Sequence, residues 1–340
     1  MIPHLESGPC FVSFSGGRDS AALLGLATRL ARERHLPDPI PVTLRFDNRP
    51  RTDETAWQEL TIDHLGLTRW GLLPIRDELD PLGPIATRVL RRHGLFWPPV
   101  AHRIAPLLEA ARGHAILLGT GGDEVFSPWT RHPTQERLHV RVRPFGKAVK
   151  RAVFNLLPER LRVYARLRRR KDMRWLRPAA RRELERRYRA QLRRRRPNWA
   201  KAIQRIPDSR NFELTQAVFR AQARDAGVTL VQPFFDPKFL RALGESAPRT
   251  GFPSRAAAME THFGDVLPAR ILQRSTKAVF DELHGGREVR AFAEAWNGHG
   301  LDPALVDPET LRRQWLSPRP EYRSLTALNA AWLASIGAER

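Results

Sequence analysis

Residues 15–20, Ser15-Gly16-Gly17-Arg18-Asp19-Ser20, combine the residue types that bind a phosphate group. Two adjacent glycines let the backbone adopt positive φ angles and approach an anion closely. An alternating apolar run precedes them and an amphipathic helical pattern follows, which predicts a strand, a turn and a helix N-terminus. The free N–H groups and the positive end of such a helix attract phosphate. We therefore expect Ser15, Gly16, Gly17 and Ser20 to bind phosphate, with Asp19 holding a magnesium ion.

The bland interpretation of these residues is an ordinary Gly-Gly turn between a strand and a helix. The segment is not a Walker loop, because no Gly-Lys-Ser/Thr follows it, and it is not a G-x-G-x-x-G dinucleotide fingerprint. The strand before it and the helix after it favour the phosphate interpretation.

A second segment, residues 115–126 (AILLGTGGDEVF), brings carboxylates to the same place. Its first four residues form a continuous apolar run, which is typical of a parallel strand buried on both faces. Open α/β sheets bind ligands at the carboxyl ends of their strands, where Asp123 and Glu124 follow. Asp19 and Asp123 could thus share one magnesium ion. The alternative is that the two acids only favour a helix N-terminus.

Two further segments are less specific by themselves. Arg274 and Lys277 lie in residues 267–280 (LPARILQRSTKAVF) and could stabilise negative charge that develops on a phosphate group. Without other support, such a pair is more often part of a solvated helix face. Residues 232–236 (QPFFD) read equally well as a structural corner, and we assign no chemistry to Asp236.

All four segments resemble motifs of one family. The S-G-G-x-D-S turn is similar to that of ATP pyrophosphatases, which cleave ATP between its α- and β-phosphates. The other three resemble the L-x-G-[DE]-G-x-D-E-x-F, P-F-L-D and L-P-x-x-[IV]-x-x-R-x-[ST]-K-x-x-F motifs of asparagine synthetases. Relatives of these enzymes include β-lactam synthetases and lasso-peptide macrocyclases. The resemblance runs from about residue 10 to about residue 285, with the motifs in family order.

The resemblance implies ATP and Mg²⁺ as cofactors and a set of site residues. The nucleotide would contact Phe14, Ser15, Gly16, Gly17, Asp19, Ser20, Leu44, Leu118, Gly119 and Lys277, with adenine against the strand backbone. Asp19 and Asp123 would hold the metal. Lys277, Arg274 and Glu124 would be catalytic, with Lys277 neutralising the transition state of amide formation.

The departures from the pattern bear on the substrate. Thr120 stands where asparagine synthetases carry a carboxylate, and Val231 stands where they usually have an arginine. Only nine residues precede the first expected strand, Ile2 follows the initiator Met, and the single cysteine is Cys10. We therefore expect no glutamine-hydrolysing domain and no release of ammonia from glutamine by this chain alone.

These observations lead us to expect an AMP-forming amide ligase that acts on a peptide or small-molecule carboxylate and on a substrate amine. Peptide macrocyclisation or small-molecule amide formation fits this expectation. One alternative is a synthetase that uses ammonia, free or from a separate glutaminase. Another is a tRNA-modifying enzyme with the same turn, and a third is a non-catalytic scaffold.

The positive charge is concentrated in one segment. Residues 131–205 hold 27 Lys and Arg against 5 Asp and Glu, which accounts for the whole net charge of +22. The segment could be a solvated helical lobe, a docking surface for an acidic peptide or carrier protein, or a nucleic-acid surface. Few aromatic residues interleave with the arginines, so we do not expect nucleic acid to be its partner.

The alternation of strands and helices over residues 1–130 predicts an α/β fold with a parallel, doubly wound sheet of the PP-loop type. Strands are expected at about 10–15, 42–47, 68–75 and 115–118, and helices at about 20–34, 53–65 (capped by Thr52) and 101–112. We expect an Arg-rich helical segment at 131–226, a returning strand (228–231) and the Lys277 region at 227–285, and a C-terminal helical cap at 286–340 with a helix at about 324–336. No apolar stretch or leader pattern indicates a membrane span or export, so the expected location is the cytoplasm.

Overall fold

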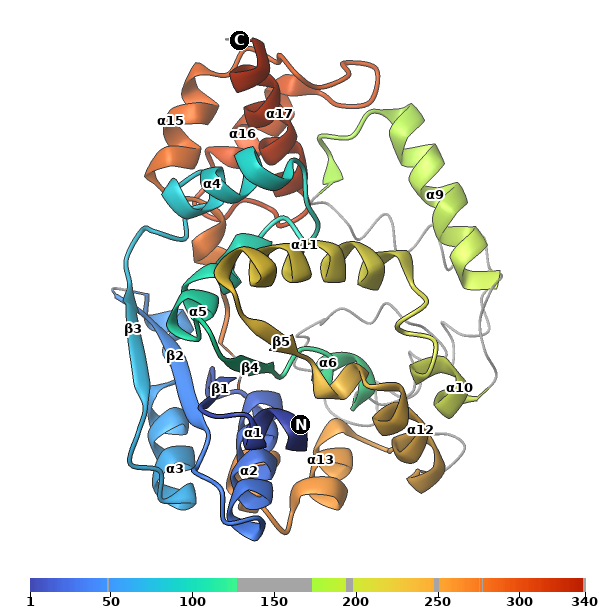
Figure 1. Cartoon of the computed structure of the whole chain (residues 1–340). Coiled ribbons are helices and arrows are strands. Elements are labelled where there is room, and N and C mark those ends of the chain that lie inside the picture. The colour runs from blue at the N-terminus through green and yellow to red at the C-terminus, as the bar shows by residue number, and fades with distance from the viewer. Residues whose placement is uncertain are drawn as a thin grey trace.

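A five-stranded parallel sheet forms the centre of the computed structural model, which describes residues 1–47, 49–126, 173–193, 198–247, 251–274, 276 and 278–338. The strands lie in the order β3-β2-β1-β4-β5 (Figure 1). Their bounds are β1 Cys10–Ser13, β2 Ile40–Phe46, β3 Gly71–Ile75, β4 Ala115–Leu118 and β5 Thr229–Val231. Because β2 and β4 lie on opposite sides of β1, the strand order reverses there, and such a switch point is where open α/β sheets bind ligands.

Helices cover both faces of the sheet (Figure 1). The α-helices of the described residues are α1 Ile2–Glu6, α2 Arg18–Glu33, α3 Thr55–Leu65, α4 Pro84–His93, α5 Ala105–Ala110, α6 Gly122–Val125, α9 Pro178–Arg193, α10 Trp199–Ile203, α11 Arg210–Ala226, α12 Pro237–Ser246, α13 Arg255–Phe263, α14 Ala269–Leu272, α15 Arg287–Ala295, α16 Pro308–Trp315 and α17 Ser324–Ala338. Short 3₁₀ turns lie at η1 Pro50–Thr52, η2 Ala101–Ile104, η4 Pro233–Phe235 and η5 Asp281–His284.

The strand residues alternate between two hydrophobic clusters, as the period of two in a strand requires. Val12 and Leu117 belong to a cluster with α2, α3 and α13, whereas Ile116 and Leu118 belong to a second cluster with α5, α11 and α17. The predicted doubly wound α/β fold of the PP-loop type, followed by a largely helical lobe, is confirmed.

Several predicted boundaries are wrong by a few residues. Helix α2 begins at Arg18 and β2 begins at Ile40, both earlier than expected, and β1 ends at Ser13. Thr52 is not the N-cap of α3. Its hydroxyl donates to the Arg49 carbonyl inside a 3₁₀ turn, and α3 starts only at Thr55.

The sequence interpretation also missed two helices. Helix α4, which begins at Pro84, carries an apolar stripe whose buried members are Ala86, Val89 and Leu90. Helix α1 precedes the first strand. The expected segment at 131–226 is described only from residue 173 onward, without residues 194–197, and there it is helical. No helix among the described residues is long and apolar enough to cross a membrane.

Candidate nucleotide and metal site

The turn after β1 is held closed by its own hydroxyls. The backbone N–H of Ser15 donates to Ser20 Oγ over 3.2 Å, and the two hydroxyl oxygens lie 3.1 Å apart. Ser20 Oγ also donates to the Gly17 carbonyl (3.0 Å), and the Gly17 N–H donates to Ser15 Oγ (3.3 Å). Gly16 has φ +80°, which a residue with a side chain rarely adopts. The predicted order of strand, turn and helix is therefore present, and the hydroxyls of Ser15 and Ser20 lie together at the N-terminus of α2. Phosphate binding by this turn stays a prediction.

The turn after β4 approaches the first turn of α2 very closely, and its glycines make this possible. A Cβ at Gly119 would lie 3.2 Å from the Ser20 backbone, and one at Gly122 would lie 2.3 Å from Asp19 Cγ. Gly121 has φ +104° and lies directly before α6. The glycines of residues 119–122 thus let Asp19, at the start of α2, lie near Asp123, at the start of α6.

One guanidinium joins the two predicted metal ligands. Arg255, the first residue of α13, contacts both carboxylate oxygens of Asp19 and one oxygen of Asp123. Burial would lower the pKa of this guanidinium, but the two carboxylates reverse the effect and hold its pKa above the usual value. The site is therefore built so that the two carboxylates share a cationic partner.

The charged groups around Arg255 also shift the pKa values of Glu124 and Arg18. Partial desolvation, together with the charges of Asp123 and Asp19, raises the pKa of Glu124, although this residue is exposed at the surface. Burial and the charge of Arg255 lower the pKa of Arg18. Glu124, predicted to be catalytic, therefore lies in the electrostatic field of the two predicted metal ligands.

The carboxylate oxygens of the site fit a magnesium ion whose remaining coordination positions are filled by phosphate oxygens. Among the described residues, no three or more His, Cys, Asp or Glu side chains gather into a metal site. Two hard carboxylate ligands plus substrate phosphates are, however, the usual way in which proteins bind Mg²⁺. Asp19 and Asp123 both contact the Arg255 guanidinium, so their carboxylates lie close enough to act as such a pair of ligands.

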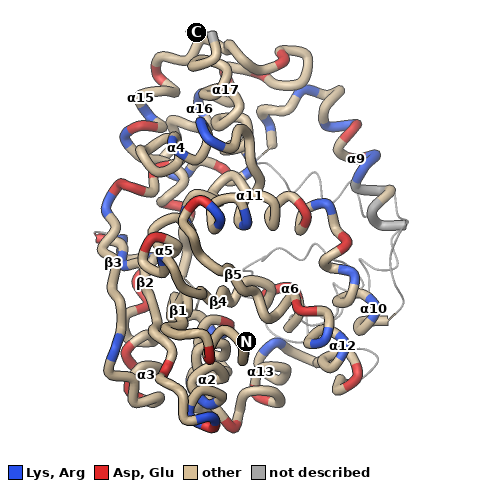
Figure 2. The backbone as a smooth tube through the Cα atoms, in the orientation of Figure 1, with Lys and Arg blue, Asp and Glu red and all other residues tan. Residues whose placement is uncertain are grey.

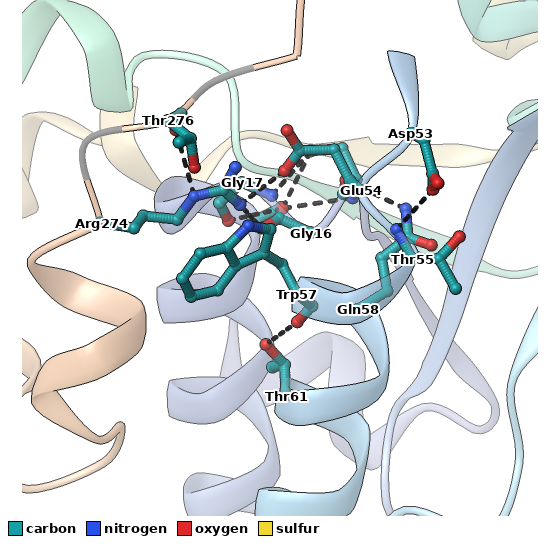
Figure 3. A network of polar contacts seen from close by, with 12 residues as sticks. Gly16, Gly17, Asp53, Glu54, Thr55, Trp57, Gln58, Thr61, Arg274 and Thr276 are labelled. Carbon is teal, nitrogen blue, oxygen red and sulfur yellow. Dashed lines mark hydrogen bonds and ion pairs between the residues drawn. The ribbon is translucent and has the colours of Figure 1, made fainter. Parts of the chain in front are cut away.

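Arg274, predicted to be catalytic, lies in a buried network on the other side of the phosphate turn (Figure 3). Its Nη1 donates to the Gly16 carbonyl over 2.6 Å and lies 2.5 Å from Glu54 Oε2. Its guanidinium carbon is 4.5 Å from the centre of the Trp57 ring, and Nε donates to the Thr276 carbonyl (3.1 Å). Nε, Nη1 and one face of the guanidinium are thus in contact with protein groups.

A model of the asparagine synthase family matches residues 5–335. The chain belongs to the asparagine synthase family. The match covers both turns, the Arg255 helix and the Arg274 segment, so the site lies inside the family domain. No curated protein matches the chain. Membership in the asparagine synthase family implies an ATP-dependent synthetase that forms amides.

The residues expected near adenine lie on adjacent strands at the carboxyl edge. Phe14 follows β1, Leu44 lies in β2, and Leu118 ends β4 before Gly119. The Phe14 side chain is buried in the core, and its carbonyl accepts the Thr43 hydroxyl over 2.6 Å. Its N–H also donates to the Val42 carbonyl over 2.8 Å, so both backbone groups of Phe14 are bonded to β2, and its expected contact with adenine stays a prediction.

The two departures from the asparagine synthase motifs lie beside one another. Thr120 Oγ accepts a hydrogen bond of 2.7 Å from Gln232 Nε2, and Val231 precedes that glutamine at the end of β5. The prediction that residues 232–236 form a structural corner agrees with the structure. Phe234 is buried, and Asp236 caps α12 by accepting from the Lys238 N–H (2.7 Å).

Lys277, predicted to be both catalytic and nucleotide-binding, lies outside the described residues, as does Ser275. Sequence interpretation missed Arg255, Glu54 and Gln58, all of which contact predicted site residues. A signal existed for Glu54, which stands with Asp53 in the first turn of the expected helix at 53–65. None existed for Arg255, because an arginine at a helix start is common.

Proposed function

We propose that this chain is an AMP-forming ligase that joins a carboxylate to an amine. In the first step, a substrate carboxylate oxygen bonds to the α-phosphorus of ATP while the bond from that phosphorus to the β-phosphate oxygen breaks. Pyrophosphate leaves with its electron pair. In the second step, the amine nitrogen bonds to the activated carbonyl carbon, loses a proton, and AMP departs.

The residues of the chain act mainly by positioning and by charge. The N–H groups of the turn and the hydroxyls of Ser15 and Ser20 orient the phosphates. Asp19 and Asp123 would hold Mg²⁺, which neutralises charge on the phosphate oxygens. Lys277 is proposed to stabilise the negative charge of both transition states, a role that rests on its position in the family motif.

One observation supports this proposal most directly. Asp19 and Asp123 both contact the guanidinium of Arg255 at the switch point of the sheet. Two turns separated by about a hundred residues in sequence would have no structural need to place two carboxylates together. A polyphosphate–metal site needs this arrangement.

We propose that the amine belongs to a peptide or small-molecule substrate, as in macrocyclisation or amide formation in a biosynthetic pathway. The neutral Thr120–Gln232 pair, at a position where the motif has a carboxylate, supports a substrate different from that of asparagine synthetases. The alternative within the same chemistry is ammonia, free or from a separate glutaminase.

The test is product analysis with ATP, Mg²⁺ and candidate carboxylates, with and without candidate amines. We expect AMP and pyrophosphate in equal amounts, formed only when a carboxylate is present, and an amide when the matching amine is added. Formation of ADP and phosphate instead would overturn the proposal. An amide formed with ammonia alone would favour the alternative.

We propose that the exposed arginines of α9 dock an acidic peptide or carrier protein. Arg181, Arg182, Arg186 and Arg187 are exposed on this helix, which stands apart from the sheet (Figure 2). Two of them also pair with Glu183, yet the helix retains a net positive charge. Such a face attracts anionic partners and raises their association rate at low salt. In the cytoplasm, the proposed location, both ATP and such partners are available.

A further inference from the structure

We propose that Glu54, Gln58 and Arg274 are positioning residues that orient the phosphate turn, and that Arg274 acts through the turn and does not touch the nucleotide. This inference rests on the proposed function. It assigns a role to the network of Figure 3, which joins α3 to the segment that precedes Lys277.

The first step of the argument concerns the two carbonyl groups of the turn. The Ser15 carbonyl accepts from Gln58 Nε2 over 3.2 Å, and the Gly16 carbonyl accepts from Arg274 Nη1 over 2.6 Å. Both peptide bonds are trans, so each carbonyl points opposite to the N–H of the next residue. Holding these carbonyls on the α3 side therefore turns the N–H groups of Gly16 and Gly17 toward the opposite side.

That opposite side is where the phosphate-binding groups gather. The Gly17 N–H reaches Ser15 Oγ, which in turn lies beside Ser20 Oγ. An N–H group that already points toward the anion site loses little conformational entropy when the anion binds. The backbone of the turn also does not have to rearrange before the N–H can attract the anion. The network thus prepares the turn for a polyphosphate.

The second step concerns why the network is rigid. Arg274 and Glu54 side chains are 2% and 7% exposed, and a buried pair of this kind keeps its geometry only when further contacts satisfy it. Trp57 stacks on the guanidinium, and the Glu54 carbonyl begins α3 by accepting from the N–H groups of Trp57 and Gln58. A Cβ at Gly16 would lie 2.7 Å from Gln58 Cγ, so the turn is packed directly against this helix.

The third step concerns the role left for Arg274. Its guanidinium already contacts Glu54, Gly16, Trp57 and Thr276, and withdrawing it to reach a phosphate would leave the Glu54 carboxylate buried without its cation. Such a loss is strongly unfavourable. Arg274 therefore transmits its effect through the Gly16 carbonyl.

The experiment compares affinities for two ligands, α,β-methylene-ATP with Mg²⁺ and adenosine, by calorimetry. In Glu54→Gln and Arg274→Lys, we expect the affinity for the ATP analogue to fall about fivefold or more, as loss of an oriented hydrogen bond to a charged group predicts. Affinity for adenosine, which lacks phosphates, should stay within about twofold. Arg103→Lys is the matched control, because Arg103 is a buried arginine that donates to the Leu283 carbonyl (2.7 Å) away from the turn.

Several outcomes would overturn the inference. Equal losses for both ligands would indicate a general structural defect, and an unchanged analogue affinity with slower turnover would make Arg274 a catalytic group. If the charged-pair variants do not fold, Gln58→Leu provides the same comparison without a buried charge, and no change in the affinity ratio there would contradict the positioning role.

The wild-type protein separates this inference from the proposed function. Failure of wild type to bind the ATP analogue would overturn the proposed function and the positioning role together. Hydrogen–deuterium exchange over residues 14–19 without nucleotide gives an independent reading. Faster exchange in Gln58→Leu than in wild type supports the orientation of the turn by α3, and identical exchange opposes it.

Discussion

The guanidinium of Arg255 contacts Asp19 and Asp123 at once, in the place where two carboxylates were expected to share a metal ion. The arginine comes from α13, far along the chain from both acids. It supplies positive charge to both carboxylates. Binding of Mg²⁺ to the same oxygens must therefore loosen these contacts.

We predict that Arg255→Gln is less stable than wild type in chelator by about 1–3 kcal/mol, because the two carboxylates lose the cation that they share. Mg²⁺ should then raise the melting temperature of the variant more than that of wild type, since the metal no longer displaces an arginine. Thermal unfolding with and without Mg²⁺ measures both effects. Arg29→Gln, which breaks an ion pair with Asp265 on the surface, is the control. Equal effects of Mg²⁺ on wild type and Arg255→Gln would contradict this account.

Asp19→Asn tests the other side of the same contact. Removing one charge from the metal pair should lower the rate of AMP formation about 100-fold or more, since charge stabilisation by such groups is of that size. The fold should survive, because Asp123 still pairs with Arg255. Steady-state assays with circular dichroism as a check on folding give the answer. A variant that turns over at the wild-type rate would remove Asp19 from the metal site.

The close approach of the two turns makes Gly122 sensitive to a single methyl group. In Gly122→Ala, the new Cβ would lie 2.3 Å from Asp19 Cγ, so Asp19 must move. We expect a loss of about 1–3 kcal/mol of stability together with weaker binding of Mg·ATP. Gly337→Ala, in α17 with nothing within 4 Å of the new Cβ, should not lower stability, since Ala favours a helix more than Gly does, and should leave Mg·ATP binding unchanged. Denaturant unfolding and calorimetry compare the two, and equal behaviour would show that the turns are not tightly packed.

Two buried histidines predict how stability depends on pH. Burial lowers the pKa of His102 from 6.5 to about 3, and burial with the charge of Arg103 lowers that of His284 to about 4. Below pH 6.5 the unfolded chain takes up protons that the native protein does not, so stability falls as pH drops from 6.5 toward 4. Each histidine should contribute a loss of about 2 kcal/mol between pH 7 and pH 5.

Urea unfolding at the two pH values measures this loss. In His102→Gln, the loss of stability between pH 7 and pH 5 should be smaller by about 2 kcal/mol, the contribution of one histidine. In His299→Gln, where the histidine is exposed, this loss should be the same as in wild type. A wild-type stability that stays flat or rises from pH 7 to pH 5 would contradict the sign of the shift.

For the α9 face, we predict that changing Arg181, Arg182, Arg186 and Arg187 to Gln weakens binding of a polyglutamate peptide at least tenfold at low salt. Fluorescence anisotropy with labelled peptide gives the affinity. The rival is nucleic acid, tested with bulk tRNA across a salt series. Tight tRNA binding with a steep salt slope would favour that rival, because it reports release of many counterions.

How much of this site the sequence could predict depends on the range of the interactions. The turn and the strand at 115–118 are local patterns. The strand was predicted with its exact bounds, and the turn was predicted at 15–20, whereas the structure has it at 14–17 because α2 begins at Arg18. Their convergence follows from the rule that parallel strands end at one edge. Asp19 and Asp123 were therefore predicted as a pair.

The contacts that the sequence could not predict are made between segments far apart in the chain. Arg255 reaches Asp19 from α13, 236 residues along the chain, and Arg274 reaches Gly16 from the segment after α14, 258 residues along the chain. Nothing in a single sequence marks which of the 58 basic residues make such contacts. Thr52 was mistaken for a helix cap because an equally good local bond, to the Arg49 carbonyl, uses its hydroxyl.

The most direct test of the central claim is carboxylate-dependent exchange of labelled pyrophosphate into ATP, run with wild type and Asp19→Asn over a panel of peptides and small acids. We predict exchange with wild type, only in the presence of Mg²⁺ and a matching carboxylate, and little or none with the variant. Exchange that needs no carboxylate, or that Asp19→Asn supports as well as wild type, would contradict the account.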